Sequence, residues 1–472
     1  MNLIYRQSVV IFFVTVIIRL LFHYLTGFTA DDAFITFRYA ENIAFGNGFV
    51  YNIGEKVLGT STPLFTMLLS CFVVFAVKPL YASLLISLVS SGLTAVVLYR
   101  LALSLRFTRL AYVPALFYIL WPRSVPVDIS GMETAFFTLL ITAGFYYQQK
   151  QKYFYSIGLA TLASLTRPEG AWLLFILIIH NGYKDKFNWR YYLAVPLLLL
   201  GPWLLFSQFY FGSVIPHSII AKLVLYNQVG TMSYFNNFLY LMAWHQQQGW
   251  LLTVAAVGGA YWLNKKQNYG WLELIWLTGM ILFFTFSKTH LFSWYIVPIY
   301  PLYILFGSAL MVWLFETIQS LKTNKSILLP VITVLMTGLL LAGLYPQMNY
   351  YRTFQNYLNS VNKEIGFYLY KKANSEKDII AAEDIGYIGY YSRIHILDRD
   401  GLVSPEAVPY NRTGRYLNLI LDYKPQWVGA SRGSPISGFI DDSLFFKSYQ
   451  LEKEFVFDKS LGYHLYSIKK IK

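Results

Sequence analysis

The chain has 472 residues, of which 56% are hydrophobic, 19% aromatic and only 13% charged. Soluble domains have about a quarter of their residues charged, so this composition excludes an ordinary soluble protein and indicates one that crosses a membrane several times. The net charge of +14 is expected to reflect cytoplasmic loops rich in Lys and Arg, and no nucleic acid is expected as a partner. The single cysteine, Cys71, excludes a disulfide or a cysteine-based metal site within one chain.

Apolar runs near the length of a membrane span, about 20 residues, recur along the chain as far as residue 345. The candidate runs are 8–26, 63–77, 80–99, 109–121, 134–148, 153–166, 171–182, 191–211, 248–263, 270–286, 292–315 and 326–345. The first follows Arg6 and lacks a small-residue cleavage site, so we expect an uncleaved anchor. Residues 347–472 hold 14 of the 24 acidic residues. We therefore predict a transmembrane domain over 1–346 and a separate water-facing domain over 347–472.

The run 63–77 decides the topology. If it spans the membrane, the basic loops that follow fall outside. If it lies against the outer face without crossing, they fall inside with Arg6, which the positive-inside rule favours. We therefore predict an α-helical polytopic protein with about eleven spans, the N-terminus inside and the C-terminal domain outside. Residues 27–79 then form one long outer loop.

Ten acidic residues precede the C-terminal domain, and seven of them face the outer side in this topology. They are Asp31, Asp32, Glu41, Glu55, Asp128, Glu133 and Glu169. Charge close to lipid is unfavourable and is usually kept for a function. Basic or titratable residues expected on the same side are Arg38, Arg123, Arg167, His217, Lys222, Lys288 and His290. Carboxylates and cations gathered at one face suit the binding of a phosphate or the activation of a hydroxyl.

Asp31 and Asp32 directly precede a predicted helix over 33–45. One Asp at a helix start can simply cap free N–H groups, but two adjacent carboxylates exceed what a cap requires. Like charges held close raise one pKa, and a cation such as Arg38 lowers another. The pair can therefore supply a general base for a hydroxyl or hold a divalent cation through oxygen ligands. The sequence leaves capping, base catalysis and metal binding open.

Two further motifs contain acids beside predicted spans. Ser130 and Glu133 have the spacing of a capping box, which is a structural alternative to a role in a site. Arg167 and Glu169 flank Pro168 at a break between two spans. They can form a local ion pair, or Arg167 can bind a phosphate.

Two outer segments carry the remaining candidates. His217 and Lys222 precede a predicted span, and Lys222 can either extend its ammonium group to lipid headgroups or meet an anionic substrate. His290 and Trp294 precede another span and can be interface anchors.

Four segments of the chain, taken together, resemble a known family. The longest, from 31 to 64, contains DDAFITFRYAEN at 31–42, GNG at 46–48, YNIGE at 51–55 and TSTPL at 60–64. The others are SGME at 130–133, RPEG at 167–170 and the segment 217–222. The first resembles the first outer loop of bacterial GT-C glycosyltransferases. The whole set is most similar to the branch that includes the mycobacterial terminal arabinofuranosyltransferases.

The resemblance implies a fold with many spans and an acid at the reaction centre in the first outer loop. It implies an enzyme that moves a hexosyl or pentosyl group from a polyprenyl-phosphate carrier to an acceptor outside the cytoplasm. The acceptor would be a glycan, a lipid or a protein, and the enzyme would lie in the inner membrane of a bacterial cell. Assembly of a cell-envelope glycan or glycolipid is the expected context.

Such a reaction assigns roles to the candidate residues. Asp31 or Asp32 would accept the proton of the attacking hydroxyl, with Asp31 slightly preferred. The cations expected to stabilise the departing phosphate are Arg38, Arg167 and Lys222. Supporting or substrate-binding positions are Glu133, Glu169, His217 and His290. We expect inversion by a single displacement, although a carboxylate nucleophile would give retention.

No cofactor is required for this reaction, because side-chain cations can cover a monophosphate. Binding of Mg²⁺ or Mn²⁺ at Asp31 and Asp32 stays an alternative. The absence of a Gly-rich nucleotide motif also fits a lipid-linked donor better than a nucleotide sugar.

The C-terminal segment is expected to form a small α/β layer with strands at 378–382, 394–398 and 426–429. Its sequence Asp398-Arg399-Asp400 could be catalytic, although a turn at the end of a strand is the simpler interpretation. We assign this domain to acceptor binding or scaffolding. The main alternative function is a membrane transporter or lipid flippase. It would require inverted repeats and acids near the membrane midplane, and we find neither pattern.

Overall fold

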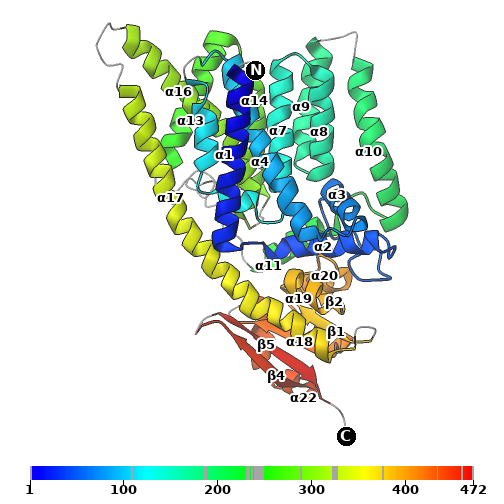
Figure 1. Cartoon of the computed structure of the whole chain (residues 1–472). Coiled ribbons are helices and arrows are strands. Elements are labelled where there is room, and N and C mark those ends of the chain that lie inside the picture. Colours follow the sequence, from blue (N-terminus) through cyan, green and yellow to red (C-terminus); the bar gives the residue numbers. More distant parts are fainter. Residues whose placement is uncertain are drawn as a thin grey trace.

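The computed structural model describes residues 3–107, 110–184, 189–229, 249–287, 290–320, 328–374, 377–432, 434–458 and 461–469, with the single positions 234 and 238. Most of these residues are helical. The helices stand side by side in a bundle that carries a small α/β domain at one end (Figure 1). The N-terminus lies at the opposite end of the bundle (Figure 1).

The bundle combines long helices with short ones. Its elements are α1 (Leu3–Thr26), α4 (Pro79–Ser104), α5 (Val113–Leu120), α6 (Ser124–Asp128), α7 (Thr134–Gln149), α8 (Tyr153–Thr166), α9 (Gly170–Lys184), α10 (Trp189–Phe211), α13 (Gly249–Gln267), α14 (Trp271–Phe286), α15 (Ser293–Ile296), η3 (Val297–Ile299), α16 (Tyr300–Ser320) and α17 (Leu328–Leu358). Three further helices lie at the end of the bundle nearer the α/β domain (Figure 1). They are α2 (Asp31–Ala44), α3 (Pro63–Val74) and α11 (His217–Val229).

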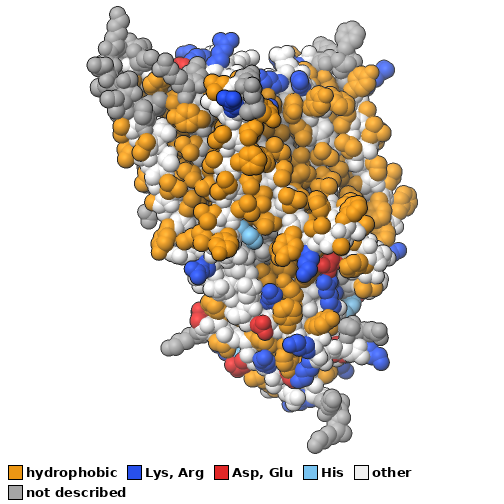
Figure 2. Space-filling view, viewed as in Figure 1, with side chains coloured by type: hydrophobic (Ala, Val, Ile, Leu, Met, Phe, Trp, Pro, Cys, Tyr) orange, Lys and Arg blue, Asp and Glu red, His pale blue; other side chains and the backbone are white. Residues whose placement is uncertain are grey.

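Several helices have the length and composition of membrane spans. Within the described ranges, five helical stretches are long and apolar enough to cross a membrane: Leu3–Thr26, Pro79–Ser104, Arg190–Phe211, Ser293–Ile318 and Val331–Lys372. Figure 2 shows a broad hydrophobic band over the bundle, with Lys and Arg at its end away from the α/β domain. The chain is therefore a multispanning membrane protein, and the count of eleven spans and their orientation stay predictions.

Among the predicted runs, 63–77 and 109–121 form the shortest helices. Helix α3 has 12 residues and packs against α2, α4 and α8. At 1.5 Å per residue it extends about 18 Å, short of the ~30 Å hydrocarbon core. The run 109–121, expected to be a full span, contains only the eight-residue α5 in its described part. This helix ends because Trp121 precedes Pro122 and adopts the extended conformation that a following proline favours.

Helix α17 connects the bundle to the α/β domain. It passes through the predicted boundary at residue 346, with Pro346 inside it. It continues through a π-helical segment, Asn359–Lys363, into α18 (Glu364–Lys372). The connection between the two parts is thus helical and not a flexible linker.

The α/β domain contains a five-stranded sheet with the strand order β2-β1-β3-β5-β4. Strands β1 (Ile379–Ala382), β2 (His395–Asp398) and β3 (Trp427–Ser431) are parallel and match the expected positions. Strands β5 (Gly462–Ile468) and β4 (Tyr449–Val456) add an antiparallel pair that the sequence analysis did not predict. The helices of this domain are α19 (Ile385–Ser392), α20 (Val408–Thr413), α21 (Tyr416–Tyr423) and α22 (Ser443–Ser448).

Helix α2 holds the α/β domain through apolar and polar contacts. The rings of Phe34 and Tyr387 lie 4.1 Å apart, between α2 and α19. Arg38 is buried and donates to the carbonyl oxygens of Gly389 at 2.8 Å and Ile394 at 2.9 Å. Beyond α2, Asn52 bonds the backbone N–H and C=O of Ile396 at 3.1 and 2.9 Å, as a neighbouring strand would. Residues 27–79, the segment predicted to form the first outer loop, therefore complete the free edge of β2.

Asp31 supplies the most specific of these contacts. Its two carboxylate oxygens accept from the amides of Gly386 and Tyr387, each at 2.9 Å. These amides begin α19, so Asp31 caps a helix that is more than 350 positions away in the sequence. A Cβ on Gly386 would lie 2.0 Å from the backbone oxygen of Asp31, so only glycine permits this approach.

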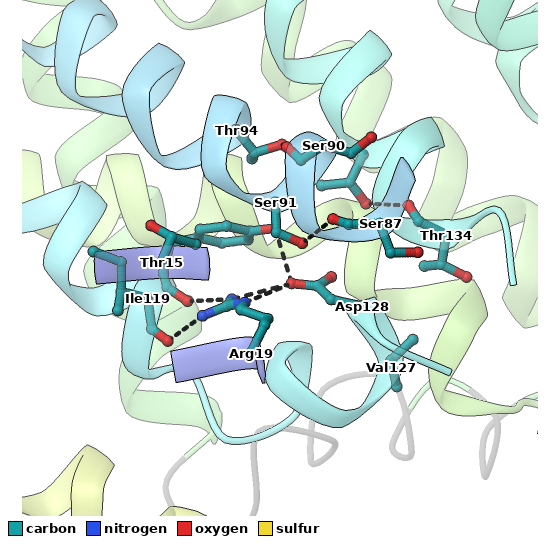
Figure 3. Close-up of polar contacts among 12 residues, drawn as sticks. Thr15, Arg19, Ser87, Ser90, Ser91, Thr94, Ile119, Val127, Asp128 and Thr134 are labelled. Carbon is teal, nitrogen blue, oxygen red and sulfur yellow. Dashed lines mark hydrogen bonds and ion pairs between the residues drawn. The ribbon is translucent and has the colours of Figure 1, made fainter. Parts of the chain in front are cut away.

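A buried ion pair lies inside the bundle (Figure 3). Arg19 of α1 is fully buried and donates to Asp128 Oδ2 at 3.0 and 3.3 Å. Its guanidinium also donates to the carbonyl oxygens of Tyr118, at 3.1 Å, and Ile119. Asp128 was predicted to be one of the outer-face acids available to a site. It is instead fully buried and paired with Arg19, a residue that the sequence analysis did not single out.

This ion pair fixes the segment that leads to the first outer loop. Asp128 ends α6, and two residues later the carbonyl of Ser130 accepts from the amide of Ala30 at 2.8 Å. Ala30 directly precedes Asp31, and Glu133 follows three residues after Ser130. The positions of Asp31 and Glu133 therefore depend on α6.

We expect Gly386→Ala to separate α19 from α2. The added Cβ meets the Asp31 backbone at a distance that requires a shift, and overpacking of this kind costs about 1–3 kcal/mol. Amide hydrogen exchange at 385–387 should accelerate by about tenfold or more. Gly438→Ala is the matched control, because nothing lies within 4 Å of its added Cβ. Unchanged exchange in Gly386→Ala would contradict the observed approach.

We expect Arg19→Met or Asp128→Leu alone to destabilise the protein by about 3–5 kcal/mol, because each leaves one buried charge without its partner. The double variant should recover most of that loss in thermal unfolding of the purified protein. Glu316→Gln is the control, because its pair with Lys266 is exposed and contributes about 1 kcal/mol or less. A double variant as unstable as the worse single variant would argue against an ion-pair role.

Candidate functional site

A cavity of about 710 Å³ opens between the first outer loop and the ends of several bundle helices. Its titratable lining residues are Asp32, Glu133, Arg167, Glu169, Lys222 and Tyr295. The lining residues with an aliphatic hydroxyl group are Thr36, Thr60, Ser61, Thr62, Ser218 and Ser287. An apolar wall from α9, α14 and the segment before η3 contains Trp172, Met280, Phe283, Phe284 and Trp294. The cavity therefore has one charged part and one apolar part.

The adjacent acids Asp31 and Asp32 lie in different environments. Asp32 lines the cavity, and no described residue hydrogen-bonds or forms an ion pair with its carboxylate. Asp31 is not a lining residue, and its carboxylate is engaged by α19. Burial raises the pKa of Asp31 to about 6, against the lowering effect of the Tyr387 amide. The capping predicted for the helix that follows the acidic pair is not observed, because Ala30 is the cap residue of α2 and no side chain caps it; Asp31 instead caps α19.

Arg167 lies between two glutamates at the side of the cavity. Its guanidinium donates to Glu169 Oε1 at 2.9 Å and to the Trp294 carbonyl at 2.8 Å, and Glu133 Oε1 lies 3.8 Å away. Burial opposes the charge of Arg167, but the two carboxylates outweigh burial and raise its pKa. Burial raises the pKa of Glu133, partly offset by Arg167. The local Arg–Glu pair is therefore observed within the cavity wall.

The capping-box alternative for Ser130 and Glu133 is wrong. Helix α7 begins at Thr134, so Glu133 occupies the cap position and not the third residue of the helix. Ser130 Oγ donates to the carbonyl of Val127 instead of capping α7. Glu133 is free of that role and lines the cavity.

Lys222 enters the cavity from α11. Burial alone would lower its pKa, but Tyr295, Asp32 and Tyr226 outweigh burial and raise the pKa above its ordinary value. No described carboxylate forms an ion pair with Lys222 within 4.0 Å. Its ammonium group is therefore a charged donor available to an anion in the cavity.

Three predicted site residues lie elsewhere. Arg38 is occupied by the two carbonyls of the α/β domain. The backbone amide of His217 donates to Leu58, and its ring is absent from the cavity lining. His290 packs with its ring 4.7 Å from that of Phe292, also outside the lining.

The structure also adds residues to the site. Thr60 and Thr62 belong to the segment that carried the resemblance, but no role had been assigned to them. Their position before Pro63, which begins α3, was the available signal. The apolar wall had been assigned to spans. Its assembly from α9 and α14 is a tertiary arrangement that no linear motif encodes.

A metal ion does not fit the acidic pair. Both oxygens of Asp31 accept from amides, which leaves Asp32 as the one carboxylate of the pair without a partner in the described chain. No group of three or more His, Cys, Asp or Glu residues in the described ranges is arranged to hold a metal ion. The pair therefore lacks the set of free oxygen ligands that a divalent cation requires.

Comparisons with known proteins agree with this architecture. Residues 349–468 match a family model described as a domain of unknown function, DUF8728. Comparison with curated proteins finds no match.

Two crystal structures of ArnT from Cupriavidus metallidurans are similar over almost the whole chain. The one bound to undecaprenyl phosphate has a TM-score of 0.60, and the apo form has 0.61. In each case the identity is 14%, with 98% of this chain and 97% of the other covered. The chain therefore has the GT-C fold that the resemblance predicted, while membership of the mycobacterial branch stays a prediction.

Proposed function

We propose that the protein is a membrane glycosyltransferase that moves a sugar from a polyprenyl-phosphate carrier to an acceptor hydroxyl at the outer face of a bacterial inner membrane. The observation that carries the proposal is Asp32, an unpaired carboxylate at a cavity that also holds Lys222. Assembly of a cell-envelope glycan or glycolipid is the proposed context, with a hexosyl or pentosyl group transferred.

The two parts of the cavity fit the two parts of such a donor. Helices α9 and α14 supply the apolar wall, which suits the first isoprene units of a lipid carrier. Lys222 lies in the charged part, where it suits a phosphate as a charge-assisted donor. The likeness to an ArnT structure bound to undecaprenyl phosphate supports a carrier of this class.

The reaction proceeds as one displacement. The acceptor oxygen attacks the anomeric carbon while Asp32 accepts its proton. The bond between that carbon and the phosphate oxygen breaks, and polyprenyl phosphate leaves with the electron pair. Lys222 stabilises the negative charge on the departing phosphate. Attack opposite the leaving group inverts the anomeric centre.

Asp31 and Arg167 have supporting roles in this proposal. Asp31 holds α2 against α19, so the base beside it stays in place. Arg167 offsets part of the negative charge of Glu133 and Glu169, which weakens their repulsion of the donor phosphate. Glu133 and Glu169 are left with free carboxylate lone pairs for sugar hydroxyls.

A transporter or flippase is not favoured. The cavity is lined by α2 and α11, which lie at one end of the bundle, whereas a transport site is expected near the middle of the spans (Figure 1).

We expect Asp32→Asn to lower kcat by about 10²- to 10⁴-fold, the usual contribution of a general base. The assay measures release of polyprenyl phosphate by purified protein from a panel of hexosyl and pentosyl donors. Asp31→Asn is the adjacent comparison. Its amide oxygen still accepts from one amide of α19, so kcat should fall by less than about tenfold. A folded Asp31→Asn variant as inactive as Asp32→Asn would move the base to Asp31.

We expect Lys222→Met to raise the donor KM by about 10- to 100-fold, the effect of losing one hydrogen bond to a charged group. Lys222→Arg should retain part of the affinity, because it keeps the charge. Lys265→Met is the control, since Lys265 is exposed at the end of α13. Unchanged donor KM in Lys222→Met would remove Lys222 from the phosphate site.

A further inference from the structure

The loops after β1 and β2 bring acidic residues to one edge of the α/β domain. Strand register pairs Ala382 with Asp398, so Glu383-Asp384 and Arg399-Asp400 follow at the same edge. Leu402, two residues after Asp400, lines the cavity. Gly59 of the first outer loop approaches this segment so closely that a Cβ would lie 2.9 Å from the Leu402 carbonyl. This edge of the domain therefore borders the site.

Some charged groups at this edge have structural roles. Asp398 accepts from the amides of Asp400 and Val403, each at 3.0 Å. Its role is the strand-end turn expected from the sequence. Glu383 accepts from the amide of Ser431 and the hydroxyl of Ser437, also at 3.0 Å. These two carboxylates are committed to the fold of the domain.

The carboxylates of Asp384 and Asp400 have no such structural role. Neither carboxylate hydrogen-bonds or forms an ion pair with a residue in the described ranges. Beside Asp400, the side chain of Asn411 is 1% exposed and donates from Nδ2 to the Asp400 carbonyl at 3.1 Å, while its Oδ1 lacks a described partner. The edge thus holds polar atoms whose hydrogen-bonding capacity is unused.

The electrostatic neighbours of these acids connect them to the reaction centre. Burial, then Asp31, Glu383, Asp400 and Asp32, raise the pKa of Asp384 well above its usual range. Burial, then Asp398 and Glu383, raise the pKa of Asp400, while Arg399 and Lys222 lower it. Asp32 is thus a charged neighbour of Asp384, and Lys222 is a charged neighbour of Asp400.

We infer that Asp384 and Asp400 form an acceptor subsite for an uncharged, hydroxyl-rich headgroup such as a sugar. The inference rests on the proposed glycosyl transfer and assigns the acceptor side of it to the α/β domain. A metal ion is not the ligand, because no group of three or more acids or histidines in the described chain is arranged for one.

Hydroxyl groups match the chemistry of this edge. A hydroxyl donates a hydrogen bond, and the carboxylate oxygens of Asp384 and Asp400 can accept it. An acceptor with a phosphate or carboxylate near the reacting hydroxyl would add negative charge beside Asp32, Asp384 and Asp400. In the proposed reaction Lys222 is engaged by the donor phosphate, and Arg399 is already bound to Gly429, Ser437 and Glu383. Repulsion among like charges would therefore exclude an anionic acceptor.

The test offers labelled donor to the purified protein with acceptors extracted from envelopes of the producing cells and divided by anion exchange. We expect label in the uncharged fraction. Asp384→Asn and Asp400→Asn should each raise the acceptor KM by about tenfold, with the donor KM changed less than twofold. Thermal unfolding establishes that each variant is folded. Glu364→Gln is the matched control, because it removes an exposed charge from the same domain.

The possible outcomes distinguish failure of the acceptor subsite from failure of the proposed glycosyltransferase function. Label in the anionic fraction, or an unchanged acceptor KM in both Asn variants, overturns the subsite and leaves the glycosyltransferase intact. Failure of the wild-type protein to consume any polyprenyl-phosphate sugar overturns the proposed function and, with it, the subsite.

Discussion

The cap that Asp31 places on α19 is the contact on which the rest of the site depends. It joins the first outer loop to the α/β domain through two backbone amides, and it does so where Gly386 allows the chains to touch. Successive residues of a helix point about 100° apart, so the neighbour of a buried cap faces a different environment. The two adjacent acids therefore have different roles. Asp31 joins α2 to α19, and Asp32 remains available at the cavity.

Local pattern predicted the elements whose signals are local. The apolar runs became bundle helices, and β1, β2 and β3 lie where alternation placed them. Asp32, Glu133, Arg167, Glu169 and Lys222 were also candidates before they were seen to share one cavity. Arg38 could not be assigned in this way, because its partners are carbonyls from residues 389 and 394, and a distant carbonyl has no sequence signature. The same holds for Asp128, whose partner Arg19 lies within an apolar run.

Charged side chains of the described residues include both ion pairs and unpaired carboxylates, the latter at the junction of the bundle and the α/β domain. Arg19 and Asp128 compensate each other inside the bundle, and at the cavity Arg167 offsets part of the charge of its two glutamates. Buried ions without such partners are strongly unfavourable, so these pairs explain how a chain with few charges can carry them at depth. Unpaired carboxylates occur among the described residues where the bundle meets the α/β domain, at Asp32, Asp384 and Asp400.

Asn52 has a consequence for the independence of the α/β domain. An uncovered edge strand invites pairing with another chain, and here a side chain from the first outer loop satisfies the edge of β2. The segment that matches a family model, 349–468, therefore does not satisfy all of its own backbone groups. Asn52 bonds the edge strand β2, and Asp31 caps α19; both residues lie near the start of the sequence. A segment recognisable in sequence comparison is thus completed in the structure by contacts with Asp31 and Asn52, which lie outside it.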